Sequence, residues 1–154
     1  MTEKKKDIFD KIMLLPGIKI FQPIYVKYKE VLLYLFFGGL TFLVSIGTYA
    51  FFNVKCEINE LVSNLLSWIA AVLFAYITNR IWVFQSSTSG VKECLREAVS
   101  FFSGRIFTLL VEEIILLIFV TVLGLNSLLV KVAAQIIVII LNYVISKKFV
   151  FREK

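Results

Sequence analysis

Four long apolar stretches constrain the fold of this chain more than any other feature of its sequence. They run from about Val31 to Phe52, Leu61 to Val83, Ala98 to Leu123 and Leu125 to Val150. A helix needs about 20 mainly apolar residues to cross a bilayer, and each stretch is long enough. Hydrophobic residues make up 59% of the chain, against roughly 45–50% in soluble domains. This pattern rules out a water-soluble globular fold and predicts an all-α membrane protein with four transmembrane helices.

The connections between the stretches predict two tight helical hairpins. Asn53–Glu60 and Gly124–Ser127 are short, whereas the middle loop, about Gln85–Glu97, is Ser-rich and mixed in charge. Lys and Arg gather in the N-terminal segment, the middle loop and the tail, and positive residues favour the cytoplasmic side. The sequence therefore predicts that both termini and the middle loop are cytoplasmic. The basic residues on that side are Lys4, Lys5, Lys6, Lys11, Lys19, Lys27, Lys29, Arg80, Lys92, Arg96, Lys147, Lys148, Arg152 and Lys154, and the opposite loops hold only Lys55.

Residues 1–28 form a basic N-terminal segment ahead of the predicted four-helix domain, residues 29–154. Thr2 is the expected N-cap of a short amphipathic helix over Glu3–Leu15, which Pro16-Gly17 ends. Its apolar face holds Ile8, Phe9, Ile12 and Met13. Such a helix is expected to lie on the cytoplasmic surface of the membrane.

The two hairpins resemble each other in sequence. Phe36-Phe37-Gly38-Gly39 opens the first span, and Phe101-Phe102-Ser103-Gly104 opens the third, about 65 residues later. Asn79–Phe84 ends the second span, and Ser146–Phe151 ends the fourth, about 67 residues later. Both hairpins enter the membrane from the same side, so we predict parallel repeats related by an axis along the membrane normal. Chance similarity between two apolar hairpins is the alternative.

Charged residues within the spans are costly and mark functional sites by default. They are Arg105, Glu112, Glu113 and Lys131. Each span carries a stripe of small or polar residues, and the simplest packing turns all four stripes inward. On the third and fourth spans, the stripes hold Arg105, Thr108, Glu112, Lys131, Gln135, Asn142 and Ser146.

Two interpretations of these charges remain open. They can neutralise one another, Arg105 with Glu112 and Lys131 with Glu113. Alternatively they form a path for an anionic headgroup, in which Arg105 receives a phosphate from the inner leaflet and Lys131 holds it near the outer one. Arg80 has the same ambiguity, because a basic residue beside interfacial aromatic residues can contact lipid phosphate or only anchor the helix.

Several classes of chemistry lack their residues in this sequence. The chain has no His, and Cys56 and Cys94 form no CxxC pair. It also has no phosphate-binding glycine loop and no GxSxG motif. We therefore predict neither catalysis nor a metal or cofactor. The net charge of +6 is ascribed to membrane topology rather than to nucleic-acid binding.

From about Tyr28 to Phe151, the sequence resembles the GtrA-like family of small four-span membrane proteins. The resemblance rests on KYKEVLLYLFFGGL, AYITNRIWVF, the Phe-Phe-Ser-Gly-Arg opening, Lys131, Asn142 and the terminal KKFVF. It implies a flippase of the bacterial cytoplasmic (inner) membrane that translocates a polyprenyl-phosphate-linked monosaccharide for glycosylation of teichoic acid, O-antigen or another surface polysaccharide. The positions that match the family's functional motif are Ala75, Asn79, Val83, Phe84, Phe101, Arg105, Lys131 and Asn142.

These observations give one leading interpretation and two alternatives. We expect Arg105, Lys131, Asn142, Asn79 and Arg80 to bind the lipid-linked sugar, with Gln135, Glu112 and Glu113 in support. One alternative is an accessory subunit that anchors a polyprenyl-phosphate glycosyltransferase without moving lipid. The other is a proton-coupled exporter that uses Glu112 or Glu113. Membrane lipids are expected partners, and a homo-oligomer could complete the narrow polar path between subunits.

Overall fold

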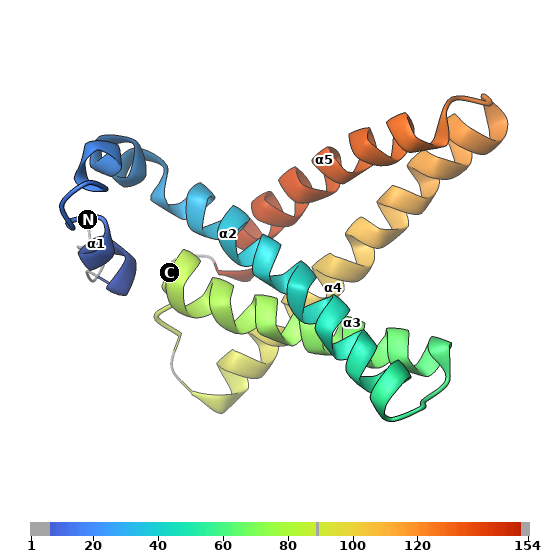
Figure 1. Ribbon diagram of the computed structural model, residues 1–154, viewed down its shortest axis with the longest axis horizontal. Helices are drawn as coiled ribbons and strands as arrows, with labels where there is room; N and C mark the ends of the chain where they lie inside the picture. The colour runs from blue at the N-terminus through green and yellow to red at the C-terminus, as the bar shows by residue number, and fades with distance from the viewer. Residues whose placement is uncertain (1–6, 89, 152–154) are drawn as a thin grey trace. The chain divides into compact units, whose positions relative to one another are not determined.

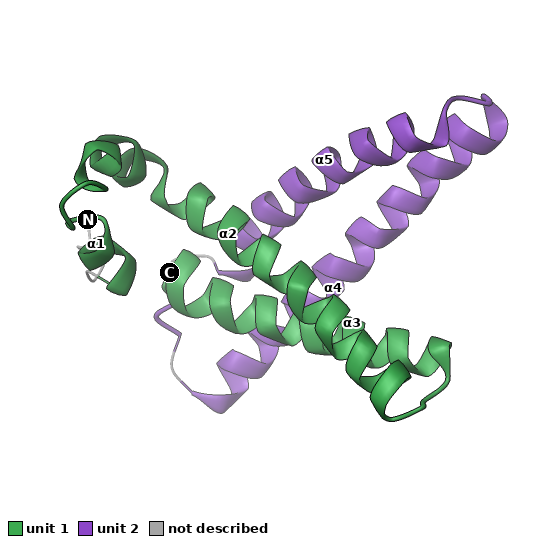
Figure 2. Cartoon of the chain, viewed as in Figure 1, with its two compact units in different colours: residues 1–85 green, residues 86–154 purple. Residues whose placement is uncertain are grey.

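The computed structural model describes residues 7–88 and 90–151, and these residues form helices and turns without a strand. The chain divides into two compact units, Met1–Gln85 and Ser86–Lys154 (Figure 2). Each unit is built around one helical hairpin (Figure 1). The all-α prediction is therefore confirmed for the described residues. Of the residues named above, Thr2, Glu3, Lys4, Lys5, Lys6, Arg152 and Lys154 lie outside them.

The first unit is built on the hairpin of α2 and α3, which pack along each other. Tyr28 has non-helical backbone angles and kinks α2 near its start. Asn59 caps α3 by accepting a hydrogen bond from the Leu61 N–H. The elements are α1 (Ile8–Ile12), the 3₁₀ turn η1 (Lys19–Phe21), α2 (Gln22–Ala50), the π turn η2 (Phe51–Lys55), α3 (Glu60–Thr78) and the π turn η3 (Asn79–Val83).

The second unit repeats this order of helix, π turn, helix and π turn. Asn126 caps α5 with its side chain, and Gly124 takes the positive φ of 66° that the tight connection requires. The elements are α4 (Val91–Leu116), η4 (Leu117–Val122), α5 (Ser127–Ile145) and η5 (Ser146–Val150). Each π turn forms the C-terminal end of the helix before it, which is a position where such turns occur.

Within residues 7–88 and 90–151, three helices are long and apolar enough to cross a membrane: Lys19–Lys55, Glu60–Val83 and Ser127–Val150. They contain the first, second and fourth predicted spans. The third predicted span lies in the continuous helix of α4 and η4, but Arg105, Glu112 and Glu113 make its apolar part more charged than the others. Length and composition therefore single out three spans, and the fourth stays a prediction.

The N-terminal helix differs from the one expected. It begins after Asp7, whose side chain accepts hydrogen bonds from the N–H groups of Phe9 and Asp10, and it ends at Ile12. The Asp10 side chain in turn accepts from the Asp7 N–H, so the two residues form a capping box. Phe9 packs edge-on against Phe36 and Phe37 of α2. The expected apolar face is thus divided, with Phe9 on the hairpin and Ile8 and Ile12 exposed.

The middle loop is shorter than predicted because α4 begins at Val91 and takes up its second half. The buried Glu97 side chain accepts hydrogen bonds from the hydroxyls of Ser86, at 2.6 Å, and Thr88, at 3.1 Å. These bonds lower the free-energy cost of burying the Glu97 carboxylate. They also hold Ser86 and Thr88, which precede α4, against the Glu97 side chain of that helix.

The second helices of the two units bury equivalent positions. Asn59 and Asn126, their N-caps, are 67 residues apart. The backbone bonds that close η3 and η5, Phe84 N–H to Asn79 and Phe151 N–H to Ser146, show the same spacing and the same length of 2.8 Å. The buried pairs at this spacing are Ser63 and Val130, Ser67 and Ala134, Ala75 and Asn142, Asn79 and Ser146, Val83 and Val150, and Phe84 and Phe151.

Candidate functional site

The charged and polar residues of α4 and α5 meet within the second unit. The Lys131 ammonium lies 2.5 Å from Glu112 Oε1, and Gln135 Nε2 donates a hydrogen bond of 2.7 Å to the same oxygen. Lys131 and Gln135 are one helical turn apart on α5, so both reach the same point on α4. We call Arg105, Thr108, Glu112, Lys131, Gln135 and Asn142 the polar cluster.

The ion pair corrects the pairing that neutralisation predicted. Lys131 pairs with Glu112 rather than with Glu113, and Glu113 is exposed. The reason is the helical rotation of about 100° per residue, which turns neighbouring side chains to different faces. Glu112 shares its face with Thr108, and both are buried within the second unit. Glu113 faces away, so the predicted partner of Lys131 was wrong, although both carboxylates were identified as charged residues of the span.

The two partners of this ion pair differ in exposure. The Glu112 side chain is 8% exposed and the Lys131 side chain is 50% exposed. A buried carboxylate needs a partner and hydrogen bonds to remain charged. Gln135 supplies a second donor, so Glu112 keeps one hydrogen bond if the ammonium moves away. The arrangement leaves Lys131 as the accessible member of the pair.

A second contact between α4 and α5 lies closer to the C-terminal end of α5. The Thr108 hydroxyl lies 3.0 Å from Asn142 Oδ1 and 3.1 Å from the carbonyl oxygen of Arg105. Thr108 and Asn142 are both buried. A hydroxyl has one proton, so it donates to one of these oxygens at a time. The bond to Asn142 fixes the register of α4 against α5 and orients the amide.

Arg105 has different surroundings from the other cations. Its guanidinium lies 5.0 Å from the centre of the Phe101 ring, within range of a cation–π interaction. Phe101 is buried and packs against Phe151. No carboxylate of the described residues pairs with Arg105, so the predicted pair with Glu112 is wrong. Arg105 is half-buried, and it presents a planar set of donors suited to a phosphate.

The remaining predicted site residues belong to the first unit. Asn79 is buried at the start of η3, where its Nδ2 donates to the Ala75 carbonyl at 2.7 Å and its Oδ1 has no partner among the described residues. Ala75, Val83 and Phe84 are buried in the same unit, and Arg80 is half-buried. The structure therefore brings Arg105, Glu112, Lys131, Gln135 and Asn142 onto one hairpin, while Ala75, Asn79, Arg80, Val83 and Phe84 line the other.

Sequence reasoning missed an ionic network in the N-terminal segment. Lys29 Nζ lies 2.9 Å from Asp7 Oδ2 and 2.7 Å from Asp10 Oδ2. Burial acts to raise the pKa of the Asp10 carboxyl, but the hydrogen bonds from Lys29 and from the Asp7 N–H outweigh it and lower that pKa. The Asp7-x-x-Asp10 spacing of a capping box is the sequence signal that could have located this network.

The described residues contain no group of three or more His, Cys, Asp or Glu side chains that could hold a metal ion. What the second unit does offer is a cation without a carboxylate partner and an ion pair with one accessible member, on helices of apolar composition. A guanidinium and an ammonium are both groups that bind anions, phosphate among them. The fold and the site thus define a small helical membrane protein with charged residues inside its hairpin.

Comparison with known proteins gives the family. The model of the GtrA/DPMS transmembrane domain matches residues 33–151, and the chain belongs to this family. It is 39% identical over 125 residues to the cell wall teichoic acid glycosylation protein GtcA of Listeria monocytogenes serovar 1/2a, covering 81% of this chain and 86% of that protein. The GtcA protein of Listeria innocua is 38% identical with the same coverage.

A further relative comes from Bacillus subtilis. The uncharacterized membrane protein YwcD is 31% identical over 121 residues, which cover 79% of this chain and 95% of that protein. No solved structure matches the chain. The family match begins at residue 33, so α1, η1 and the start of α2 lie outside it.

Proposed function

We propose that this protein is a flippase, which translocates a polyprenyl-phosphate-linked monosaccharide across the bacterial cytoplasmic membrane for glycosylation of teichoic acid or another surface polymer. The polymer comes from the relatives, which are named as cell wall teichoic acid glycosylation proteins. Residues 29–154 form the transport domain in this proposal, and residues 1–28 are an accessory segment. The α4–η4 helix is its fourth span, and the two hairpins are parallel repeats.

One observation carries the proposal: α4 holds a cation that no carboxylate of the described residues neutralises. An arginine in an apolar helix is costly unless something compensates its charge. The ring of Phe101 compensates part of it. A lipid phosphate supplies an anion with the bidentate geometry that a guanidinium prefers. We therefore assign the first phosphate contact to Arg105.

The ion pair between Lys131 and Glu112 provides the second step. Arg105 and Glu112 are seven residues apart on one helix, which corresponds to about 10 Å along its axis. A phosphate that leaves Arg105 can form an ion pair with the accessible ammonium of Lys131, which then separates from Glu112. Gln135 continues to donate to Glu112, which lowers the cost of breaking the pair. The Glu112 carboxylate then pairs with Lys131 again, which helps to release the phosphate. The polyprenyl chain stays in the lipid throughout.

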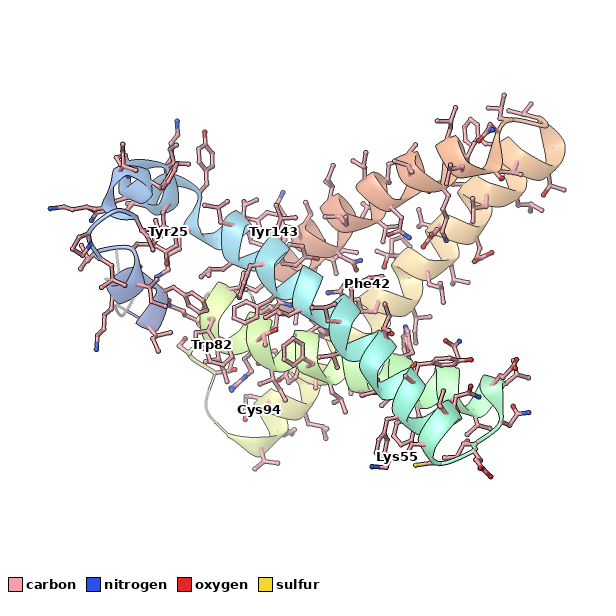
Figure 3. All side chains as sticks on the ribbon, viewed as in Figure 1. Tyr25, Phe42, Lys55, Trp82, Cys94 and Tyr143 are labelled. Atoms are coloured by element: carbon pink, nitrogen blue, oxygen red, sulfur yellow. The ribbon has the colours of Figure 1, made fainter. Side chains whose placement is uncertain are left out.

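The proposed topology places both termini and α1 in the cytoplasm. The two native cysteines report on it, because Cys56 is exposed in the turn after η2 and Cys94 lies near the start of α4. Figure 3 shows Lys55, the residue before Cys56 in the sequence, at the turn between α2 and α3. In intact cells, a membrane-impermeant thiol reagent should label C94S, which retains Cys56, and should not label C56S. Labelling of C56S alone would reverse the orientation.

The function is tested in cells that lack the gene for this protein. Complementation with the wild-type chain should restore the sugar on the surface polymer, whereas R105A and K131A should reach the membrane without restoring it. K148A is the matched control, since Lys148 is an exposed lysine of η5 outside the polar cluster. Lipid-linked sugar should accumulate when translocation is blocked. Normal glycosylation with both R105A and K131A would remove these residues from the mechanism.

One observation favours a second candidate, an accessory subunit of a polyprenyl-phosphate glycosyltransferase. The matching family model describes a transmembrane domain shared by GtrA and DPMS proteins. In this alternative, the basic end of the second unit, Lys147 and Lys148 with the exposed Phe149, would contact the enzyme. Purified protein in liposomes separates the two, because an anchor alone moves no lipid-linked sugar.

A further inference from the structure

The N-terminal segment encloses a pocket that the polar cluster does not use. It has a volume of about 450 Å³, within the 300–1,000 Å³ of typical small-molecule sites. All of its lining belongs to the first unit. The polar walls come from Asp10, Gln22, Tyr25, Lys29, Glu30 and Gln85, and we call this space the N-terminal pocket.

Specific contacts hold the walls of the pocket in place. Lys29 bridges Asp7 and Asp10, and Gln85 Nε2 donates to Asp7 Oδ2 at 3.1 Å. These bonds tie α1, the start of α2 and the end of η3 together. Phe9 adds apolar contacts on Phe36 and Phe37. The pocket is therefore a built feature of the first unit rather than a gap beside a loose segment.

Tyr25 points to a ligand. The residue is 7% exposed, and its hydroxyl lies near the Asp10 carboxylate but makes no well-aligned hydrogen bond with the described residues. Buried hydroxyls without a partner are uncommon because each loses its bonds to water. Figure 3 shows Tyr25 between α1 and the start of α2. A ligand in the pocket that carries a hydroxyl would supply the missing bond.

The charges of the lining favour an uncharged ligand. Asp10 and Glu30 are balanced by Lys27 and Lys29, and Asp7 behind the wall adds one further negative charge. A phosphate would gain little here, in contrast to the surroundings of Arg105. Carboxylates, amides and a phenol instead offer many acceptors and donors for hydroxyl groups. Met13, Leu14, Val26 and Val83 supply apolar surface, which suits the C–H face of a sugar ring.

We propose that the N-terminal pocket binds the monosaccharide of the lipid-linked substrate and selects which sugar is transported. This rests on the proposed function and makes recognition of the sugar a step that precedes the contact of its phosphate with Arg105. The lining up to Glu30 precedes residue 33, where the family match begins, so sugar selection lies largely outside the shared domain. Val83 and Gln85 place the pocket at the end of η3, which is cytoplasmic in the proposed topology.

The test compares two tyrosines that differ in their relation to the pocket. Y25F removes only the unpartnered hydroxyl, and Y28F makes the same change at an exposed tyrosine outside the lining. The purified full chain in lipid vesicles is titrated with bare polyprenyl phosphate and with polyprenyl phosphates that carry glucose, galactose or N-acetylglucosamine. Thermal stability is measured for each variant.

We expect the wild-type chain to bind one sugar-bearing lipid more tightly than bare polyprenyl phosphate. Y25F should weaken that binding by about three- to ten-fold, the effect of one lost hydrogen bond. It should leave binding of bare polyprenyl phosphate within about two-fold and should change the stability little, because the hydroxyl makes no well-aligned hydrogen bond with the described residues. Y28F should match the wild-type chain. Q22A, at a second lining position, should change the sugar preference in the same assay.

The other outcomes separate the two proposals. If Y25F and Q22A keep the sugar preference of the wild-type chain, the pocket proposal is overturned and the proposed flippase function is not. An equal loss of affinity for all four lipids in these variants leads to the same conclusion. A wild-type chain that binds bare polyprenyl phosphate without preferring any sugar does the same. Failure to bind any of the four lipids overturns both. Unchanged binding and transport in R105A and K131A overturns the proposed phosphate path while a sugar preference lost in Y25F still supports the pocket.

Discussion

The two units bury equivalent positions but use their polar residues differently. On α3 of the first unit, Ser67, Thr78 and Asn79 donate to carbonyl groups of their own helix. In the second unit, Thr108 bonds across the hairpin to Asn142, and Glu112 receives both Lys131 and Gln135. These three side chains of the first unit therefore bond within their own helix, whereas those of the polar cluster bond between α4 and α5. Under the proposed function, the shared buried positions serve packing and the charges of the second unit serve transport.

The largest effect is expected when Lys131 of the ion pair is replaced by the residue at the aligned position of the first unit. Lys131 aligns with Asn64, 67 residues earlier, so K131N gives α5 the residue that α3 carries. We expect transport to be lost and stability to fall by up to about 3 kcal/mol, because Glu112 keeps a buried charge without its cation. Glycosylation assays and denaturant unfolding in detergent measure the two effects.

The double variant K131N/E112Q distinguishes the loss of transport from the loss of stability. Removing both charges should restore most of the stability without restoring transport. N64K, the reverse change in the first unit, should not rescue K131N. Transport by K131N/E112Q at the wild-type rate would mean that the pair serves only the fold.

The next effect concerns two glycines at matching positions inside the first helix of each hairpin, Gly39 in α2 and Gly104 in α4. A Cβ on Gly104 would lie 2.9 Å from Cγ2 of Ile145, whereas a Cβ on Gly39 meets nothing within 4 Å. Isoleucine is stiff in a helix, so α4 and α5 must move apart to admit the methyl group. We expect G104A to be less stable than G39A by about 1–3 kcal/mol in denaturant titrations. Equal stabilities would show that the close approach is unimportant.

A smaller effect is expected at the threonines of the two first helices. T108V removes the hydroxyl that bonds to Asn142, and T41V removes one that donates to the Phe37 carbonyl of its own helix. Hydrogen bonds between membrane helices contribute about 0.6 kcal/mol on average. T108V should therefore lose about 0.6–2 kcal/mol, and T41V should change little in the same unfolding assay. A loss as large in T41V would contradict the distinction between local and interhelical bonds.

The smallest effect is the pH dependence of the N-terminal segment, which has no counterpart in the second unit. The lowered pKa of Asp10 means that its contribution is complete above the pKa of the unfolded chain, about 3.9, and is lost as the pH falls through the folded value. The groups around it are Asp7, Lys29 and Tyr25. We expect α1 to detach below about pH 4, at a cost of about 1 kcal/mol or less.

A spin label on α1 measures this detachment. Placed by I12C in a chain that carries C56S and C94S, it should become mobile in acid and immobile at neutral pH. K29M should leave the label mobile at both pH values. A label that is equally immobile at pH 3 and pH 7 in the wild-type background would show that the ion pairs do not hold α1.

Much of the fold followed from the sequence because apolar length and turn residues act locally. The hairpin connections and the tight turn at Gly124 are as expected. The partner of Lys131 was not predictable in the same way, because Glu112 and Glu113 are equally charged and only the packing of α5 on Thr108 and Glu112 decides between them. Helix α4 begins early because Glu97 finds hydroxyl partners that its own sequence neighbourhood does not reveal.

The site was predicted only in part for a related reason. Glu112 lies on the polar stripe of α4, and Lys131, Gln135 and Asn142 lie on that of α5; the structure joins the two stripes within one hairpin. The N-terminal pocket depends instead on Lys29 meeting Asp7 and Asp10 about twenty residues away, after the chain turns back on itself. A periodic pattern cannot encode such a contact. The role of Asp7 as a cap was readable, whereas its ion pair was not.

The central claim is that the charges of the second unit move a lipid phosphate without help from another protein. It is tested most directly by reconstituting the purified chain in liposomes and following a short-chain polyprenyl-phosphate-linked sugar from the outer to the inner leaflet. The account predicts translocation by the wild-type chain and its loss in R105L, which places at Arg105 the residue found at Leu40, the aligned position of the first unit. Absence of translocation by the wild-type chain, or an unchanged rate in R105L, would contradict it.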